Sequence, residues 1–322
     1  MPSTVSGDLD REEFLRAAEA YRGELIAHCY RMVGSVHEAE DLVQETYLRA
    51  WRGWEAFEGR ASTRNWLYRI ATNLCLTAVT NKQRRVLPSG LGPAAAGSGA
   101  KLERLWLEPF PERWPDMDPA EIVAGRSSLR LALVASLLHL PPRQRAVFIL
   151  REVLAYPAAE VADMLGMSLA ATKSALQRAR AKLDEVSPRA DAVIEPDSPH
   201  ARALLERYIT AFENADVAGL TELLRDDAIL ESTATGRWLA GKTHCIERLL
   251  IWARSGEYRL YPVIANGQPA MVAYRGEHTD PALTAFGVVV LAVDDRHVTH
   301  VTAFIDPGVV RHFGFPEVDP GH

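Results

Sequence analysis

Residues 157–183, PAAEVADMLGMSLAATKSALQRARAKL, constrain the fold more than any other part of the sequence. They predict a short helix, a turn at Gly166 and a longer second helix, because Pro157 suits a first helical position and Ser168 is a good N-cap residue. In the second helix, apolar side chains recur at helical spacing, while the opposite side is small, basic and able to form hydrogen bonds. This arrangement is typical of a helix-turn-helix whose second helix enters the DNA major groove. The residues expected to contact DNA are Thr172, Lys173, Ser174, Gln177, Arg178, Arg180 and Lys182.

A plain αα-hairpin with a solvated outer face is the alternative explanation of this stretch, and the local charge argues against it. From Pro142 to Leu183 there are seven Lys/Arg and three Asp/Glu, although the whole chain has a net charge of −6. A local cationic surface neutralises phosphates and supplies most non-specific DNA affinity. The stretch is therefore interpreted as DNA-binding, but it does not indicate which kind of DNA-binding protein contains it.

The length of 322 residues predicts two or three domains, and an apolar fraction of 48% is ample for ordinary cores. No apolar run approaches membrane-spanning length and the N-terminus has no signal segment, so a cytoplasmic chain without membrane contact is expected. The cysteines, Cys29, Cys75 and Cys245, have no CxxC spacing and are interpreted as small buried apolar residues. His28 and His244 each adjoin a cysteine, but no further ligand follows at suitable spacing. No metal or other cofactor is expected.

The two parts of the chain differ in charge. Residues 1–190 hold 25 basic and 23 acidic side chains (25 − 23 = +2), whereas residues 191–322 hold 11 and 19 (11 − 19 = −8). A slightly basic front joined to an acidic rear indicates that the two parts have different roles. The acidic part, residues 191–322, would either repel DNA or cover a basic surface of residues 1–190.

Residues 13–85 predict a compact helical domain. Its second helix, residues 38–54, has an apolar inner face at helical spacing. Its other side presents a leucine among two carboxylates and an amide, which is typical of a protein-binding face with an apolar centre and an acidic rim. An ordinary solvated face with one stray leucine is the alternative. The residues of this face are Asp41, Gln44, Glu45 and Leu48.

A third helix, from Thr63 to about Thr80, carries aromatic residues and ends in a basic cluster. Core packing is the default explanation for Trp66 and Tyr68. Aromatic faces beside phosphate-neutralising cations are also what binding to single-stranded or melted DNA requires. The residues considered for that role are Trp66, Arg69, Asn73, Asn81, Lys82, Arg84 and Arg85.

At this point the chain resembles the extracytoplasmic-function (ECF) sigma factors of RNA polymerase. The resemblance covers roughly half of the chain and is carried by HCYRMVGS, EAEDLVQETYLRAW, WLYRIATNLC and LPPRQRAVFILREVLAYPAAEVADMLGMSLAATKSALQRARAKL. It implies two all-α sigma domains, a region 2 helical bundle over residues 13–85 and a region 4 helix-turn-helix over residues 121–186.

The resemblance also implies partners and roles. The DLVQET helix would bind the clamp coiled-coil of the polymerase largest subunit, and the third helix with its basic end would open and read the minus-ten promoter element. The helix-turn-helix would read the minus-thirty-five element. The implied partners are RNA polymerase core, at its clamp and flap, and promoter DNA, while the existence of a separate anti-sigma protein stays open.

Two linkers are predicted. Residues 86–120 begin with a flexible Gly/Ala/Pro-rich piece and continue as WLEPFPERWPDMDP, where the prolines forbid a helix and favour an extended chain. Large aromatic residues in an extended segment rarely stay solvated, so this piece should dock onto the C-terminal domain or into a polymerase channel. WLEPFP resembles a motif of sigma factors with a fused C-terminal domain. Helices are expected at 119–139 and 141–154, and residues 187–199 form a short acidic linker.

Residues 200–318 predict helices first and a run of antiparallel strands after them, which makes an α+β domain. The stretches RYITAFENADVAGLTELLRDDAILE, GRWLAGK, ANGQPAMVAY and FGFP resemble the SnoaL-like, NTF2-like cone fold, whose curved sheet normally encloses an apolar pocket. Helices are expected at 201–214, 217–224 and 243–254, and strands at 258–265, 270–274, 283–293 and 298–304.

The residues expected to line that pocket are Trp238, Trp252, Tyr274, His300 and Phe304. Some members of the fold are cyclases or isomerases that use a pocket carboxylate or histidine. The sequence shows no Asp–His or Glu–His pair at a spacing that indicates acid–base catalysis. Because a fold does not by itself imply an activity, no enzyme is expected.

The sequence favours a promoter-specific initiation factor that its C-terminal domain regulates in cis, by inhibiting or by assisting. A small-ligand sensor or a cyclase/isomerase-type enzyme in the C-terminal pocket, with transcription as its output, is the second hypothesis. A conventional dimeric helix-turn-helix repressor is the third, and it leaves the polar face of the 38–54 helix unexplained.

Overall fold

The computed structural model describes residues 14, 16, 18–54, 57, 62–81, 107–112, 129–186, 196, 198–233, 237–276 and 282–321. The chain divides into two compact units. The first comprises residues 1–84, 114–129 and 133–186, and the second comprises residues 85–113, 130–132 and 187–322.

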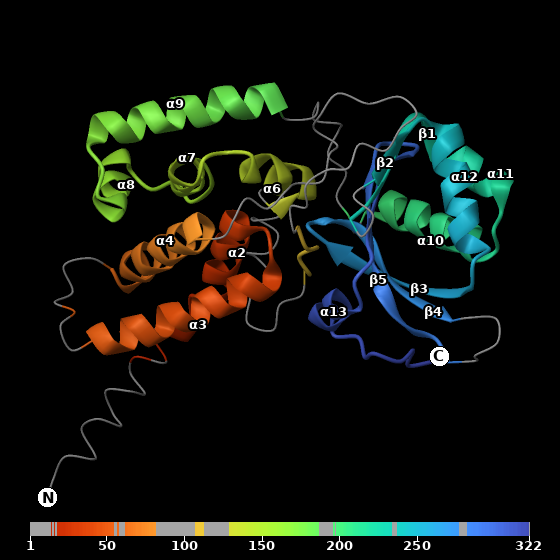
Figure 1. Ribbon diagram of the computed structural model, residues 1–322, viewed down its shortest axis with the longest axis horizontal. Coiled ribbons are helices and arrows are strands. Elements are labelled where there is room, and N and C mark those ends of the chain that lie inside the picture. Colours follow the sequence, from red (N-terminus) through yellow and green to blue (C-terminus); the bar gives the residue numbers. More distant parts are fainter. Residues whose placement is uncertain are drawn as a thin grey trace, which may run out of the picture. The chain divides into compact units, whose positions relative to one another are not determined.

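The first unit begins with three helices that pack on one another (Figure 1): α2 (Arg22–Val33), α3 (Val36–Gly53) and α4 (Thr63–Asn81). Gly34 ends α2 in the left-handed conformation (φ 80°), which glycine adopts without steric cost. Ser35 then caps α3, because its side chain accepts a hydrogen bond from the N–H of Glu38. The two turn residues therefore fold α3 back against α2.

Ala20 and Tyr21 form a turn that separates the helical residues before them from α2. Inside this bundle, buried His28 lies 2.9 Å from the hydroxyl of Thr72. The Thr72 hydroxyl donates to the carbonyl of Tyr68, so the ring Nε2–H of His28 donates to Thr72. Burial, followed by the charges of Arg31 and Arg64, lowers the pKa of His28 to about 3.

The described remainder of the first unit supplies the helix-turn-helix, and its expected turn at Gly166 (φ 59°) is confirmed. The helix expected at 141–154 is instead an α-helix followed by one π-helical turn. The expected start of the preceding helix at Pro119 lies outside the described residues. The elements are α6 (Leu131–Leu138), α7 (Pro142–Phe148), η1 (Ile149–Val153), α8 (Ala158–Leu165) and α9 (Leu169–Val186), of which residues 131 and 132 belong to the second unit.

The second unit is built on a six-stranded sheet of order β2-β1-β6-β5-β4-β3. The last four strands confirm the sequence prediction, but the first two were not expected. β1 also pairs in parallel with β6, so the sheet is mixed rather than antiparallel. The strands are β1 (Leu224–Ser232), β2 (Arg237–Ala240), β3 (Glu257–Ala265), β4 (Gln268–Gly276), β5 (Thr284–Val293) and β6 (Val298–Phe304).

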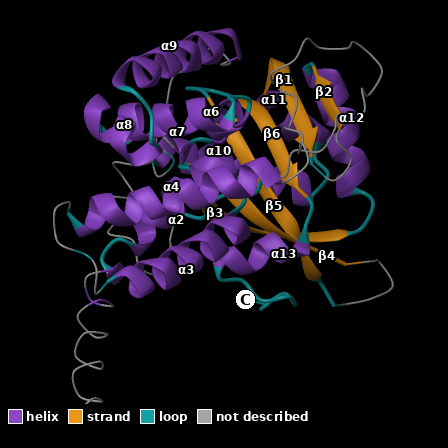
Figure 2. Cartoon of the chain, turned by 60° about the vertical axis from the view of Figure 1, so that its left-hand side comes forward, coloured by secondary structure: helices purple, strands orange, loops and turns teal. Residues whose placement is uncertain are grey.

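One face of this sheet is covered by α10 (Pro199–Glu213), α11 (Val217–Leu223) and α12 (Lys242–Ala253). Figure 2 draws these helices in purple and the strands in orange. Tyr208, Leu249, Met271 and Val301 belong to the apolar core between these layers. The chain ends with the short α13 (Pro307–Val310), a 3-10 turn and a tail. The expected α+β architecture of this domain is confirmed.

None of the helices in the described part of the chain combines the length and the apolar character needed to span a bilayer. All three cysteines are buried with free thiols, as their spacing predicted.

Candidate functional site

The α3 face places its predicted residues together on the surface of the first unit. The side chain of Leu48 is half-exposed, and Gln44 and Asp41 are exposed one and two turns before it, respectively. Trp51, 38% exposed, extends the apolar centre of this face by one turn, and the sequence analysis had missed it. Its spacing of i+3 from Leu48 could have indicated it.

The two carboxylates at the rim of the same face each pair with a basic side chain one turn away on α3. Glu45 accepts a hydrogen bond from Arg49 at 2.7 Å, and Asp41 lies 3.9 Å from His37. Both pairs are exposed, and exposed i,i+4 pairs contribute little. The carboxylates therefore stay available to a partner.

On α4 the predicted residues have two kinds of environment. Trp66 is half-buried and stacks on Phe57, with ring centroids 4.6 Å apart. Arg69 and Asn73 are exposed on the helix surface. Tyr68 is buried in the core, as its default explanation required. The side chain of Asn81 and the residues Lys82, Arg84 and Arg85 lie outside the described residues.

The outer face of α9 carries exposed polar side chains. Lys173 and Gln177 are exposed, and Arg178 donates a hydrogen bond to the Ser174 hydroxyl at 2.6 Å. Two further predicted residues form exposed ion pairs, Arg180 with Glu152 and Lys182 with Glu185, each at 2.9 Å.

Thr172 is a correction to the predicted DNA-contacting set. It is only 1% exposed, and its hydroxyl donates to the carbonyl of Ser168, so it packs on the inner face of α9. Its position on the apolar stripe of the helix could have shown this.

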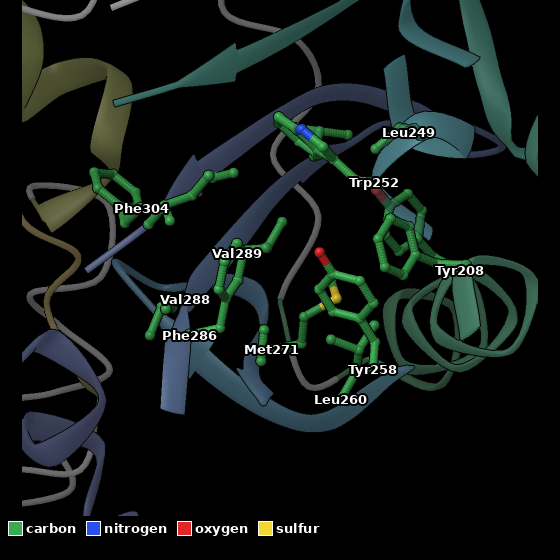
Figure 3. Close-up of a pocket in the computed structure, with 16 residues that line it drawn as sticks. Tyr208, Leu249, Trp252, Tyr258, Leu260, Met271, Phe286, Val288, Val289 and Phe304 are labelled. Carbon is green, nitrogen blue, oxygen red and sulfur yellow. The ribbon is translucent and has the colours of Figure 1, made fainter. Parts of the chain in front are cut away.

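The second unit contains an apolar pocket of about 480 Å³, a volume that includes its open mouth. Figure 3 shows aromatic rings from α10, α12, β3, β5 and β6 around it. Burial raises the pKa of the Tyr208 phenol in its wall. The lining residues are Tyr208, Phe212, Leu249, Trp252, Tyr258, Leu260, Met271, Ala273, Phe286, Gly287, Val288, Val289, Val301, Ala303, Phe304 and Ile305.

Trp252 and Phe304 line this pocket, but three predicted lining residues do not. His300 precedes the pocket residue Val301 on β6 and so points to the opposite sheet face, where it lies 3.5 Å from Glu231. Trp238 is the register partner of Glu231 and shares that face. A Glu–His pair thus exists, but on the face opposite to the pocket.

Tyr274 is the third of these residues. Its hydroxyl donates to the carbonyl of Pro316 at 2.7 Å, and its ring meets Tyr261 edge-on. Its neighbour Ala273 faces the pocket. Tyr274 therefore lies under the C-terminal tail, a contact that no local sequence pattern indicates.

The linker segment 107–112 docks within the second unit on the turn between β3 and β4. Phe110 and Asn266 exchange two backbone-directed hydrogen bonds, Phe110 N–H to Asn266 Oδ1 at 2.8 Å and Asn266 N–H to Phe110 O at 2.7 Å. Asn266 has φ 55°, which asparagine tolerates in tight turns. Phe110 is buried, and Pro111 bridges to Ala265 on the edge strand β3. Of the two predicted docking places, the C-terminal domain is the one observed.

Comparison with known proteins defines the class. The model of Sigma-70 region 2 matches residues 17–85, and that of Sigma-70, region 4 matches residues 130–183. ECF RNA polymerase sigma factor SigG of Mycobacterium tuberculosis (strain ATCC 25618 / H37Rv) is 48% identical over 319 residues, which is 96% of this chain and 86% of SigG. Probable ECF RNA polymerase sigma factor SigI of the same organism is 27% identical over 91% of this chain and 93% of its own.

Among solved structures, the crystal structure of the extracytoplasmic function sigma factor SigJ of Mycobacterium tuberculosis matches 91% of this chain and 97% of its own, with a TM-score of 0.63 and 23% identity. That likeness supports the fold. The protein is thus of the sigma-70 class. More narrowly, the chain belongs to the ECF RNA polymerase sigma factors, and it is an alternative sigma factor that directs promoter-specific transcription initiation.

Proposed function

We propose that this chain binds RNA polymerase core through the face formed by Asp41, Gln44, Glu45 and Leu48, with Trp51 as a further apolar contact. An exposed apolar centre with a charged rim is the usual composition of such an interface. The complex would act in the cytoplasm, on promoter DNA. The supporting observation is the exposure of Leu48 and Trp51 on one side of α3.

The minus-ten element would be opened and read by α4, through Trp66, Arg69, Asn73 and the basic segment that follows from Asn81 to Arg85. Aromatic faces bind unstacked bases, and the cations neutralise phosphates. The minus-thirty-five element would be read by α9. Lys173, Ser174, Gln177 and Arg178 supply hydrogen-bond donors for base edges, and Arg180 and Lys182 supply charge.

Regulation in cis would act through the linker. The segment around Phe110 belongs to the stretch that connects region 2 with region 4, and it is fastened to Asn266 of the C-terminal domain. A docked linker has a shorter free length than a flexible one, so the docking limits how far the two DNA-reading regions can separate. This hydrogen-bonded attachment is the observation that carries the proposal.

The test is transcription in vitro with purified core polymerase over fragments of genomic promoters. The full chain is compared with a chain that ends at residue 186. The proposal expects both chains to associate with core and their promoter output to differ. Identical core affinity and identical output from the two chains would contradict regulation in cis.

A second function, a small-ligand sensor in the C-terminal pocket, is favoured by the lining of that pocket. Its walls are aromatic and aliphatic, and the surface that the described lining residues present to it is apolar. Among the described lining residues there is no carboxylate or imidazole for acid–base work, so the pocket would bind without turning over its ligand. An uncharged, largely apolar molecule fits this chemistry.

The sensor function is tested with apolar ketones, steroids and polyketide-like compounds as probes. Binding should quench or shift the fluorescence of Trp252 and raise the melting temperature of the chain. A Trp252→Phe variant, which keeps the apolar wall, identifies the source of the fluorescence signal. Turnover of any probe would contradict a purely sensory pocket.

A further inference from the structure

The first turn of α9 presents apolar side chains to solvent. Leu169 is 44% exposed, and Ala170 and Ala171 are exposed beside it. The buried side of the same helix is formed by other residues, among them Ala175 and Ala179. The three exposed residues, 169–171, are called the apolar turn below. Their exposed surface is left over after the core of the first unit has formed.

The N-terminus of α9 holds the apolar turn in place. The Ser168 hydroxyl accepts a hydrogen bond from the N–H of Ala171 at 3.1 Å, and the Ser168 carbonyl accepts one from the N–H of Thr172 at 2.9 Å. The hydroxyl of Thr172 donates a second bond to the same carbonyl, at 3.1 Å. Because the cap already fixes this backbone, a ligand that contacts the apolar turn has little ordering left to do.

The apolar turn continues into the polar residues expected to contact DNA. Ala170, Ser174 and Gln177 are spaced by four and three residues, so they lie on one line along the outer face of α9. Leu169 lies one turn before Lys173, on the adjacent line. The outer face therefore has two chemical parts. Its first turn is apolar, and its next two turns are basic and form hydrogen bonds.

The position of the apolar turn indicates which chemical group it contacts. In a helix-turn-helix the second helix lies in the major groove, with the residues of its N-terminal end against the base edges. The apolar group at those edges is the C5-methyl of thymine, and alanine is among the side chains that contact it. The other bases present hydrogen-bonding atoms there, which would lose their partners against a leucine.

A protein partner fits the apolar turn less well. The cores of protein interfaces are enriched in aromatic residues, methionine and arginine and are depleted of alanine, whereas two of these three residues are alanines. The next turns of the same face carry the exposed cations Lys173 and Arg178. Cations at this place favour a polyanion such as DNA.

We propose that Leu169 and Ala170 recognise thymine methyl groups in the upstream promoter element. The polar residues of the following turns read neighbouring bases by hydrogen bonds, so the two parts of the face share the recognition. The inference rests on the proposed role of α9 in reading the minus-thirty-five element. It adds the class of base that the first turn selects, and two residues outside the set that the sequence predicted.

Deoxyuridine tests the contact, because it lacks the methyl group of thymidine and keeps the same base pair. The upstream element preferred by the holoenzyme is first selected from a randomised promoter fragment. Each thymine of that element is then replaced singly by deoxyuridine, and binding of the holoenzyme is measured by fluorescence anisotropy. At the positions that face the apolar turn, each replacement should weaken binding by about fourfold, the effect of burying one methyl-sized group.

A double variant assigns the methyl effect to the side chains. Leu169→Ser with Ala170→Ser removes the apolar surface at exposed positions, so fragments with thymine and with deoxyuridine should bind this holoenzyme equally. The matched control is Ala181→Ser, since this exposed alanine lies on the same line of α9, about three turns beyond Ala170. The control should keep the preference for thymine. An unchanged preference in the double variant would overturn the proposal.

The remaining outcomes separate this inference from the function on which it rests. A wild-type holoenzyme that selects an upstream element without thymine, or that responds to no deoxyuridine, would overturn the methyl contact alone. A holoenzyme that selects no upstream element would contradict the role given to α9. A double variant that loses affinity for core polymerase but keeps its preference for thymine would assign the apolar turn to the polymerase and overturn the proposal.

Discussion

The backbone N–H of Phe110 donates a hydrogen bond to Oδ1 of Asn266, which lies 156 positions further along the chain, at 2.8 Å. The N–H of Asn266 returns a bond to the Phe110 carbonyl at 2.7 Å. These two bonds fasten the connection between the sigma regions to the C-terminal domain. Breaking these bonds is the most specific way to release the linker from the C-terminal domain without deleting the linker or the domain.

We therefore predict the effect of releasing the linker. Phe110→Ala removes a buried ring, a change that typically costs about 3–5 kcal/mol, and Asn266→Gly removes the acceptor while keeping the left-handed turn. In the double variant, backbone amides of 107–112 should exchange faster with solvent and transcription should differ from that of the wild type. Asn214→Gly is the control for loss of an asparagine side chain. Unchanged exchange at 107–112 would contradict the docking.

Core binding is predicted to depend on the exposed α3 face. Leu48→Ala and Asp41→Ala should each weaken core affinity by about tenfold, since interface residues that matter cost more than about 1 kcal/mol when truncated. The fold should persist because both side chains are exposed. Surface plasmon resonance against immobilised core measures the affinity, and Glu206→Ala on α10 is the control. Wild-type affinity in both α3 variants would refute the assignment.

Promoter recognition is predicted to depend on Arg178. Its guanidinium is exposed on α9 and held only by the short bond to Ser174 among the interactions described for it. Arg178→Ala should weaken binding of the holoenzyme by about 1–3 kcal/mol at sites with the preferred base, and relax the preference at that position. A uniform loss over all sequences would show a phosphate contact instead. Binding to a randomised upstream element distinguishes the two outcomes.

Acid is predicted to destabilise the first unit through His28. Its pKa is lowered to about 3 in the folded chain and is near 6.5 when unfolded, so between these values the unfolded state binds the additional proton. Stability is full above pH 6.5 and falls as the pH decreases, by about 2 kcal/mol between pH 7 and pH 5. Protonation would place an N–H at Nδ1, which has no hydrogen-bond partner.

Urea unfolding followed by circular dichroism at pH 5, 6 and 7 measures this dependence. His28→Gln keeps an amide donor for Thr72 and should reduce the slope against pH. The same slope in both chains would show that His28 does not control the acid sensitivity.

Much of the architecture follows from local patterns in the sequence. Gly166 and Ser168 predict the helix-turn-helix, and the apolar period of α3 separates its buried face from Leu48. The gap between the strands expected at 283–293 and 298–304 is short enough for a hairpin, and in the turn between β5 and β6 Asp294 N–H donates to His297 O at 2.9 Å. These features depend on near neighbours in the chain, which is why the sequence contains their signal.

The parts that the sequence did not predict depend on distant neighbours. β1 carries Arg225, Asp226 and Asp227 in succession, which obscures a strand, and it is held by parallel pairing with β6. Along each strand, residues that face the pocket alternate with residues of the opposite sheet face. The pairing of β4 with β5 shifts in register after Ala273, which interrupts this alternation. An error of one residue in the alternation along a strand moves a side chain to the other face of the sheet. For this reason the prediction that Tyr274 and His300 line the pocket was wrong.

The contact between α4 and α8, in which the side-chain amide of Asn65 donates to Glu160 at 3.1 Å, belongs to the same category. Asn65 and Glu160 are 95 positions apart, and each looks like an ordinary exposed helix residue in its own segment. Nothing in either local pattern indicates the other. Such pairs become visible only when both helices are placed in one unit.

The central claim is that this chain is a polymerase adaptor whose C-terminal domain sets its output through the linker. Transcription in vitro with core polymerase over a genomic promoter library tests it most directly, with the wild-type chain and the Phe110→Ala/Asn266→Gly variant side by side. The account predicts discrete start sites that require the chain, with an output that changes when the linker is released. No association with core and no chain-dependent transcript from either protein would contradict it.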